Sequence, residues 1–588
     1  MKGLGKLVGN ENKKVWKQTG LRVILIIIAA LTALSPVFNF LASRALNYEG
    51  YGNYMYDPDN IQSQLEYAQE NGDVLTEKYW RVYESTVNFF EKNGIVSEWQ
   101  IYFFRDDYAQ ALGWLTIVET VAPGGFTAED ITNSMLTDFI YEHMREDESL
   151  SELEPENISR TLADARKALA ELENDILSFT LGDYYASRLA DAEAERDKRA
   201  ATLEAYQNGT LGLGVSGSSQ LDAEYTKYMC ENAERALEAA ELSVWGWQQL
   251  TENLYEYGSW QYNTVNKMIT RMNVSGDFGA IASEELFNSR EYGESLRYSY
   301  ETYEQYEKEM HSCSKQWDES KALVLYSLEH GIPLRGTVNS SSKEMLTSEV
   351  SSMLGNLVIF MIILAGMTLS NEYTSGTIRL LLIRPQSRSK ILTSKLVSLY
   401  VWWLAAAGAG ALLLGGECML LFGIKDLFKP DLFIIGGRVA EIPSLITLII
   451  KILLAVLSAS PIVLFALLIS TLIKKAALPI ALSMMGRFAT SVVIMLSVVL
   501  NLTFPHMHFE YSPFPYLDLA SMVGNAADAY AGSSYFSLNE IISDMTGGYA
   551  TLSSSIYNIW IGIAWMLFFS ALMLVLSFVS FNKQQIKN

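Results

Sequence analysis

The chain of 588 residues has few of the residue types that build chemical sites. It contains three cysteines, five histidines and 13 prolines. Three cysteines are too few for a disulfide framework, and no G-x-x-x-x-G-K-[ST], HExxH, CxxC or GxSxG pattern occurs. Without that phosphate-binding loop, we do not expect the chain to hydrolyse a nucleotide in the P-loop manner. The chain is therefore predicted to be no enzyme, with no catalytic residue, metal site or cofactor of its own.

Two small groups contain metal-ligand residue types and leave a second interpretation open. In the first group a calcium loop of the EF-hand type lacks its glycine and glutamate at the right offsets, and a helix cap by Asp59 or Asn60 is the alternative. In the second group an incidental cluster is the alternative to a metal site at the outer face. The groups are Asp57, Asp59 and Asn60, and His506, His508 and Glu510. Likewise, Cys230 and Cys313 are either paired or separate buried thiols.

The charge of the chain is divided sharply along the sequence. Residues 44–345 contain 54 acidic and 24 basic residues, a net charge of −30, whereas the remainder contains 12 acidic and 20 basic residues. The remainder is also rich in long apolar runs. We interpret this division as an acidic, water-facing domain joined to a mildly basic membrane unit. The acidic domain either attracts cationic peptides or metal ions, or simply presents a solvated surface.

Six apolar runs reach the length of about 20 residues that a helix needs to cross a bilayer. They lie at residues 23–42, 353–369, 396–422, 445–473, 476–500 and 556–581. Clusters of Lys and Arg precede the first run, follow the second, separate the fourth from the fifth and follow the sixth. All four clusters fall on one side of a six-span topology, which predicts cytoplasmic termini. A cleaved signal peptide is the alternative for the first run.

These observations predict an all-α polytopic membrane protein with a large helical extracellular domain between its first two spans. The expected parts are listed in chain order: a cytoplasmic amphipathic connecting segment (1–22), the first transmembrane helix (23–43), the extracellular acidic helical domain (44–345), and transmembrane helices two to six (346–588) with a cytoplasmic loop at 371–395.

The extracellular domain contains two heptad-like apolar series, at residues 158–179 and 229–254. A glycine- and serine-rich stretch, residues 208–220, lies between them. The pattern predicts an antiparallel coiled-coil hairpin with this stretch at its tip. A third helix is predicted at about residues 298–329, where the chain returns to the bilayer.

The loop after the second run is the most informative segment, with the sequence NEYTSGTIRLLLIRPQSRSKILTSK at residues 371–395. By itself it is either an amphipathic segment at the membrane interface or an ordinary basic loop. It resembles the first cytoplasmic loop of ABC-2-type permeases, with the pattern E-x-x-x-G-T-hydrophobic-basic followed by R-P-x-S-R. The matching positions are Glu372, Gly376, Thr377, Ile378, Arg379, Arg384, Pro385, Ser387 and Arg388. The six-span layout, the basic N-terminus and the Tyr511–Leu519 run extend the resemblance over the membrane unit, but not over the extracellular domain.

The resemblance implies a permease subunit energised by a separate ATP-binding-cassette ATPase. In that family the first cytoplasmic loop forms a coupling helix against the ATPase, which here corresponds to residues 372–388, with residues 11–20 as a connecting helix. ATP and Mg are then bound by the partner chain. The implied complex contains two ATPase subunits and a second permease subunit, surrounded by membrane lipid; no nucleic acid is expected.

Three charged residues lie within or near the apolar runs, where an unpaired charge costs about 2.5–3.5 kcal/mol. They are Glu417, Lys451 and Arg487. Glu417 and Lys451 form a candidate ion pair because the third and fourth spans are antiparallel neighbours. For Arg487, a contact with a cavity or headgroup is as plausible as structural pairing.

Three functions follow from the sequence. The first is an exporter of peptides, lipids or amphipathic compounds in a bacterial plasma membrane. The second is a sensor or resistance module whose extracellular domain binds an antimicrobial peptide or an envelope partner without bulk transport. The third is a structural scaffold. The sequence leaves open the cargo, the direction of transport, the ligand of the extracellular domain, and whether the permease pairs with itself.

Overall fold

The computed structural model of the chain forms two compact units. Unit 1 contains residues 1–42, 196–243 and 258–588, and unit 2 contains residues 43–195 and 244–257. The residues that the structure describes are 4–46, 54–122, 125–143, 153–211, 220–272, 280–290, 292–294, 297, 300, 302–338, 341–377, 387–435, 437–473, 475–503, 507–520 and 558–583.

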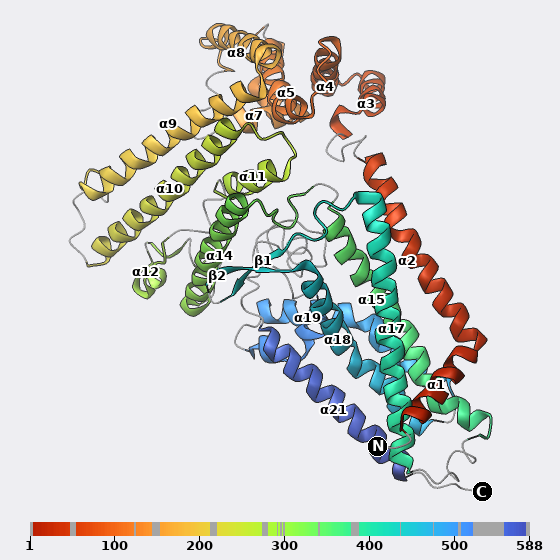
Figure 1. Cartoon of the computed structure of the whole chain (residues 1–588). Helices are drawn as coiled ribbons and strands as arrows, with labels where there is room; N and C mark the ends of the chain where they lie inside the picture. The colour runs from red at the N-terminus through yellow and green to blue at the C-terminus, as the bar shows by residue number, and fades with distance from the viewer. Residues whose placement is uncertain are drawn as a thin grey trace. The chain divides into compact units, whose positions relative to one another are not determined.

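Long helices account for most of the membrane part of unit 1 (Figure 1). In chain order they are α1 (Leu4–Lys17), α2 (Thr19–Leu46), α15 (Ser342–Thr374), α17 (Arg388–Phe422), α18 (Ser444–Leu472), α19 (Ala477–Thr503) and α21 (Ile559–Lys583). Two short 3-10 turns, Phe509–Tyr511 and Phe514–Tyr516, follow α19.

Each of the six predicted spans coincides with one of these helices. Among the residues that the structure describes, five helices are long and apolar enough to cross a membrane, namely α2, α15, α17, α18 and α21. The chain is therefore a multi-pass, mainly helical membrane protein. The fifth predicted span coincides with α19, a helix of 27 residues that is not among these five. Its membrane crossing stays a prediction.

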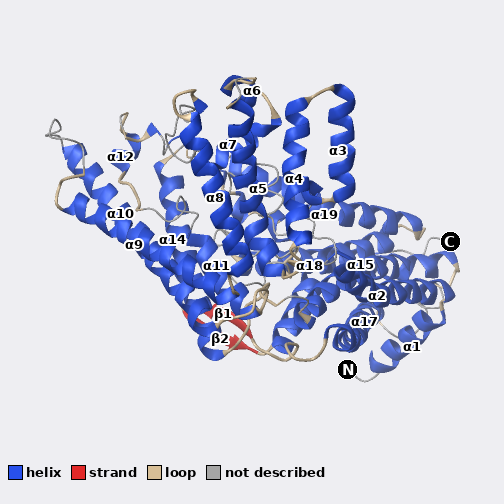
Figure 2. Cartoon of the chain, turned by 90° about the horizontal axis from the view of Figure 1, so that it is seen from above, coloured by secondary structure: helices blue, strands red, loops and turns tan. Residues whose placement is uncertain are grey.

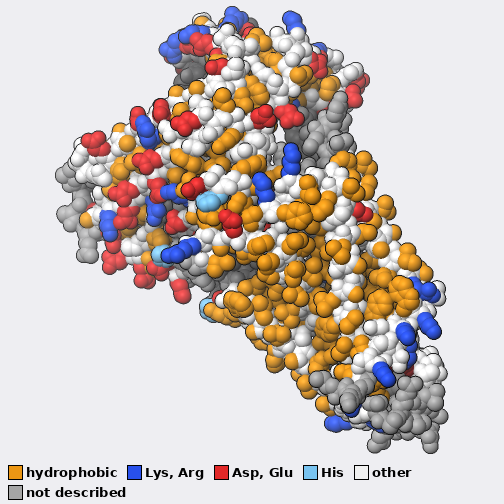
Figure 3. Space-filling view, in the orientation of Figure 1, with side chains coloured by type: hydrophobic (Ala, Val, Ile, Leu, Met, Phe, Trp, Pro, Cys, Tyr) orange, Lys and Arg blue, Asp and Glu red, His pale blue; other side chains and the backbone are white. Residues whose placement is uncertain are grey.

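The membrane helices share one apolar core. Leu21 and Ile28 of α2 are buried in the same cluster as Met361 of α15, Trp403 of α17 and Val463 of α18. That the first span is retained, and not removed as a signal peptide, stays a prediction. Other apolar side chains of these helices remain exposed, and Figure 3 shows them gathered over the membrane helices. Exposed apolar surface of this extent is expected for helices that face lipid or a partner subunit.

A short antiparallel hairpin connects α17 to α18 and was not predicted from the sequence. Its strands are β1 (Asp431–Ile435) and β2 (Arg438–Ile442), shown in red in Figure 2. Gly437 in the turn has φ of +76°, a conformation that favours glycine. The strands are only five residues long, too short for a strong alternating pattern, so the all-α prediction overlooked them.

The inserted segment, residues 54–341, contains the remaining helices. In unit 1 it contributes α11 (Trp260–Met272), α12 (Glu284–Asn288) and α14 (Tyr303–His330). In unit 2 it contributes a 3-10 turn (Tyr54–Tyr56), α3 (Pro58–Asn71), α4 (Val74–Lys92), α5 (Glu98–Val121), α6 (Ala128–Thr132), a 3-10 turn (Met135–Thr137), α7 (Asp138–His143) and α8 (Ile158–Ser178). Two further helices, α9 (Leu181–Gln207) and α10 (Gln220–Asn253), contain residues of both units. The predicted helix at 298–329 corresponds to α14.

The helix that precedes the glycine- and serine-rich stretch is not the predicted one. The apolar series at 158–179 forms α8, which packs on α5. The Tyr108 hydroxyl of α5 donates a hydrogen bond to Glu173 of α8 at 3.1 Å. Arg166 of α8 forms an ion pair with Glu119 of α5 at 2.8 Å. Helix α8 ends at Ser178 because Thr180 and Asp183 cap the start of a new helix, α9. The helices on either side of the 208–220 stretch are therefore α9 and α10.

Two alternatives left open by the sequence are resolved in part. Asp57 caps α3, because its carboxylate accepts a hydrogen bond from the Asp59 amide at 3.0 Å. A helix cap is therefore observed, but it is provided by Asp57 and not by Asp59 or Asn60. Cys230 has a free thiol, as the interpretation without a disulfide predicts. The side chain of Cys313 and the whole of His506 lie outside the described part, and His508 contacts Glu510 at 3.1 Å.

The core of unit 2 gives a first test of the fold. A Cβ at Gly113 of α5 would lie 2.3 Å from the ring of Phe139, which is fully buried. We expect Gly113→Val to destabilise the protein by about 1–3 kcal/mol, because the ring has no space to move away. Gly125→Val, with nothing within 4 Å of its Cβ, serves as the control. Thermal unfolding of the full chain in detergent measures both, and equal midpoints would contradict the described packing.

Candidate functional site

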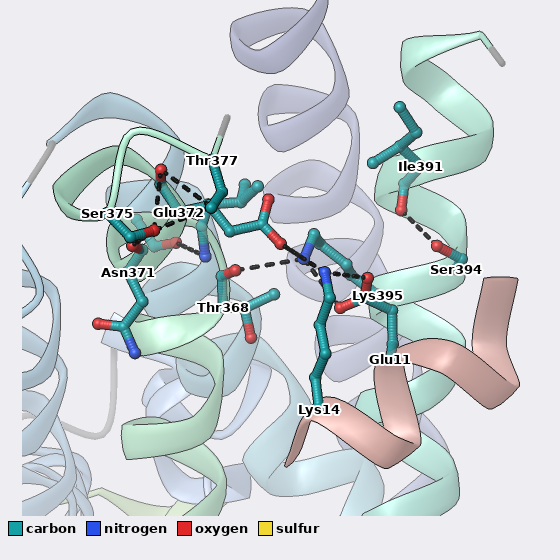
Figure 4. A network of polar contacts seen from close by, with 12 residues as sticks. Glu11, Lys14, Thr368, Asn371, Glu372, Ser375, Thr377, Ile391, Ser394 and Lys395 are labelled. Carbon is teal, nitrogen blue, oxygen red and sulfur yellow. Dashed lines mark hydrogen bonds and ion pairs between the residues drawn. The ribbon is translucent and has the colours of Figure 1, made fainter. Parts of the chain in front are cut away.

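Four charged side chains meet where α1, the end of α15 and the start of α17 come together (Figure 4). Lys395 Nζ lies 2.7 Å from Glu372 Oε1 and 3.0 Å from Glu11 Oε2. Lys14 Nζ lies 3.2 Å from the same Glu372 oxygen and 3.1 Å from Glu11 Oε1. Two ammonium groups thus alternate with two carboxylates, and the cluster has no net charge. We call these four residues the junction cluster.

The junction cluster is sheltered from water to different degrees. The Lys395 side chain is 2% exposed and that of Glu372 is 10% exposed, whereas Lys14 is 54% exposed. Burying a charge is costly unless it is paired and hydrogen-bonded. Lys395 meets this condition with two carboxylates and the Thr368 carbonyl oxygen at 3.4 Å. Lys395 is therefore the residue on which the cluster depends.

The ion pairs shift the pKa values of the two cluster residues on α1, Glu11 and Lys14. Burial by itself would raise the pKa of Glu11, but the charges of Lys395 and Lys14 outweigh it and lower that pKa below its usual value. Burial would lower the pKa of Lys14, but Glu372 and Glu11 together raise it. Glu11 therefore contributes stability above its ordinary pKa and loses it as the pH falls through the lowered value.

Two further contacts fix α1 against α17. Asn12 accepts a hydrogen bond from the Ser398 hydroxyl. The rings of Trp16 and Trp402 stack with centroids 5.8 Å apart and planes 12° apart. Together with the junction cluster, these contacts hold the amphipathic helix against residues 395–402 of α17.

Helix α15 ends at Thr374, two residues after Glu372. The Ser375 and Thr377 hydroxyls lie 2.9 Å apart, and Gly376 has φ of +70°. A glycine is favoured there because an L side chain is strained at positive φ. After a gap at 378–386, Ser387 accepts a hydrogen bond from the Lys390 amide and begins α17. Arg388 donates to the Asn582 carbonyl oxygen of α21 at 3.0 Å.

Of the predicted loop residues, Glu372 is part of the junction cluster. Gly376 and Thr377 lie in the turn after α15, and Arg388 lies at the start of α17 with its contact to α21. The other three, Arg379, Arg384 and Pro385, lie outside the described residues. Sequence reasoning missed Glu11 and Lys14, and it counted Lys395 only as part of a basic loop. One signal was available: Glu11 is the single acidic residue among the first 22, three residues before Lys14.

The three charges predicted within the spans have separate surroundings. Lys451 of α18 is 5% exposed and lines a cavity of about 20 Å³ with Lys343, Thr447 and Asp431. The charged neighbour of Glu417 is Glu349 of α15, whose carboxylate accepts a hydrogen bond from Asn39 of α2 at 2.5 Å. The Glu417–Lys451 ion pair stays a prediction.

Arg487 of α19 lies against α15. The Arg487 Nη2 atom lies 3.6 Å from the position that a Cβ atom on Gly355 would occupy.

A comparison with protein families decides the class of the chain. The family model described as "ABC-2 family transporter protein" matches residues 169–586. The chain belongs to this family. The family implies a permease subunit of an ABC transporter, a membrane-embedded protein that generally works with an ATP-binding-cassette ATPase. Comparisons with curated proteins and with solved structures return no match.

The extent of the family match corrects one expectation. The resemblance found in the sequence was confined to the membrane unit, but the matched residues of this ABC-2 transporter protein begin at Leu169, in α8. The match therefore takes in more than half of the inserted segment together with the last five predicted spans. Much of that segment is thus part of the family pattern.

The junction cluster makes a direct prediction about stability. Removing Lys395 leaves two carboxylates facing each other in a buried site, so we expect Lys395→Ala to cost about 3–5 kcal/mol. Lys14→Ala removes an exposed member of the same cluster and should cost less than about 1 kcal/mol. Thermal unfolding in detergent compares the two variants. Similar losses for both would show that burial of Lys395 does not control the cluster.

Proposed function

We propose that the chain is the permease subunit of an ATP-driven exporter, energised by a separate ATPase that binds the loop between α15 and α17. The observation that carries this proposal is the junction cluster, in which Glu372 of the matched motif is joined to α17 by Lys395 and to α1 by Lys14. A loop that begins at such a cluster is suited to transmit force, because any displacement of the loop acts on three helices.

The proposed topology places both termini, α1 and the junction cluster in the cytoplasm and the inserted segment outside the cell. The inside-positive distribution of Lys and Arg supports this orientation. The complex contains two permease subunits and two ATPase subunits, and the ATPases bind ATP and Mg. We place it in a bacterial plasma membrane, with peptides, lipids or other amphipathic compounds as candidate cargo.

Coupling in this proposal is a shift between two states. ATP binding closes the ATPases, which brings the two loops of the permease dimer together and favours one arrangement of the spans. Such a shift requires contacts that differ between the states. The exposed contacts of Lys14 are suited to change, whereas the buried pair of Glu372 and Lys395 is suited to persist as a fixed pivot.

The second candidate, a sensor or resistance module, is favoured by the inserted segment. Unit 2 has its own core, in which Tyr79, Trp80, Trp114, Ile117 and Phe139 are buried. A region with its own core can bind a peptide or an envelope partner by itself. Transport assays separate the candidates, because only the exporter moves cargo across the membrane.

Association with the ATPase tests the proposed role of the loop. Gly376→Val places a β-branched residue at φ of +70° beside the junction, so we expect the tagged permease to lose most of the ATPase that co-purifies with it. Gly423→Val strains a glycine with φ of +91° at the opposite end of α17 and is the matched control. Equal recovery of ATPase with both variants, or a fully active permease that never binds an ATPase, contradicts the proposal.

Labelling in intact cells tests the topology. In a background without the three native cysteines, Val96→Cys lies in the inserted segment at a position 85% exposed, and Lys390→Cys lies at the exposed start of α17. A membrane-impermeant maleimide should label position 96 in intact cells and position 390 only after the cells are opened. The reverse pattern would overturn the orientation.

A further inference from the structure

A cavity of about 210 Å³ lies between residues 225–232 of α10 and residues 282–292, a stretch that includes α12. Three tyrosines line it, namely Tyr225, Tyr228 and Tyr292. All of its lining residues belong to unit 1, so the cavity lies within a single compact unit. We call this cavity the tyrosine pocket.

The floor of the tyrosine pocket is fixed by the core beneath it. Ala282 and Leu286 line the pocket and are 1% and 2% exposed. The Ala282 amide donates a hydrogen bond to the buried Tyr306 hydroxyl at 2.9 Å. On the other wall, Asn232 of α10 accepts a hydrogen bond from the Ala280 amide at 2.6 Å. The two walls are therefore tied together, as is usual for a binding site that exists before its ligand arrives.

The aromatic rings of the pocket are polarised towards negative charge. Tyr225 and Tyr292 stack with ring centroids 4.3 Å apart, and Tyr228 lies 6.4 Å from Tyr225 with the ring planes 41° apart. All three side chains are only partly buried, so a ligand can reach them. The Tyr292 hydroxyl donates to the Asp222 carboxylate at 2.7 Å, and such a bond polarises the phenol further. The face of an aromatic ring is its negative part and attracts cations.

The charge around the pocket also favours a cation. No charged side chain lines it in the part of the chain that the structure describes. Residues 220–241, which contain the α10 wall, include six acidic and two basic residues, a net charge of −4. The guanidinium of Arg297 donates to the carbonyl oxygens of Phe287 and Ser289 and does not line the pocket. An anionic ligand would therefore meet repulsion without a cation to bind it.

The size of the pocket limits the ligand to a small group. Drug-sized ligands occupy cavities of about 300–1,000 Å³, and this cavity is smaller. Its remaining lining includes the flexible thioether side chain of Met229 and the apolar floor. These surfaces suit methyl or methylene groups next to a positive charge.

We propose that the tyrosine pocket binds an alkylammonium group, supplied by a small quaternary ammonium compound or by a lysine side chain of a peptide. The positive charge lies against the tyrosine rings, and the hydrocarbon part lies against Met229 and Leu286. The inference goes beyond the proposed function, since it names a ligand class for the inserted segment in an exporter and in a sensor alike.

Two pairs of matched probes test the inference. The full chain in neutral detergent and 0.15 M salt is titrated calorimetrically with choline and with 3,3-dimethylbutan-1-ol, which has the same shape without the charge. N-acetyl-lysine amide and N-acetyl-norleucine amide form the second pair. We expect the charged member of at least one pair to bind about tenfold more tightly than its neutral partner, which corresponds to about 1.4 kcal/mol. The pair with the tighter charged member identifies the source of the ammonium group.

Variants separate the pocket from the acidic surface around it. Tyr225→Leu should remove most of the preference for the charged probe, and Tyr225→Phe should keep it because the ring remains. Met229→Lys, which brings a like charge to the pocket, should abolish the preference as well and decides the matter if Tyr225→Leu fails to fold. Tyr67→Leu, at a tyrosine of α3 that is 64% exposed, is the control and should behave as the wild type.

Equal affinity for the charged and neutral members of both pairs overturns the inference. A preference that persists in Tyr225→Leu and Met229→Lys also overturns it, because the cation is then attracted by the acidic surface in general. Binding to the purified chain requires no ATPase. Failure of this inference is therefore distinguishable from failure of the proposed function, which is measured by co-purification of the ATPase.

Discussion

A membrane protein has few ways to keep a buried charge, and this constraint explains the junction of α1, α15 and α17. Lys395 lies where α17 packs on α15 and is almost completely removed from water. It is stable there because Glu372 and Glu11 both approach its ammonium group. Since Glu11 comes from α1, the amphipathic helix is required to complete the site. The pairing of Lys395 therefore contributes to the position of α1, together with the Asn12–Ser398 hydrogen bond and the Trp16–Trp402 stack.

Polar contacts fix the other end of α15 in a similar way. Asp426 lies between α17 and β1, and its carboxylate accepts hydrogen bonds from the Ser341 and Ser342 hydroxyls. The Ser342 Oγ lies 2.6 Å from Asp426 Oδ1. Lys343 pairs with Asp431 of β1 at 2.9 Å, and the Tyr326 hydroxyl of α14 donates to Glu441 of β2 at 2.9 Å. Between these ends α15 is the most enclosed span, with Met361, Ile362 and Ala365 fully buried. A rigid helix held at both ends is suited to connect the proposed ATPase loop with the β1–β2 hairpin and α14.

Much of the architecture follows from local patterns. The apolar runs, the Gly376 turn after Glu372 and the capped helix at 303–330 all depend on residues close in sequence. Errors arose where a residue had more than one possible partner. The seam at 158–179 has the spacing of a coiled coil, but Thr180 and Asp183 begin a new helix after it, and α5 covers the seam instead. The β1–β2 hairpin is short and stabilised mainly by its neighbours, so its pattern is weak.

The sequence by itself determined the class of the protein, because the length of an apolar run, the position of basic residues and a motif are properties of a single segment. It also determined that the charged residues at positions 417, 451 and 487 lie within or near apolar runs. Only the tertiary structure decided which charges meet. Glu11 and Lys395 are 384 residues apart, and their contact depends on how α1 returns to α17. Pairing between distant segments is set by packing of the whole membrane unit, which no local pattern records.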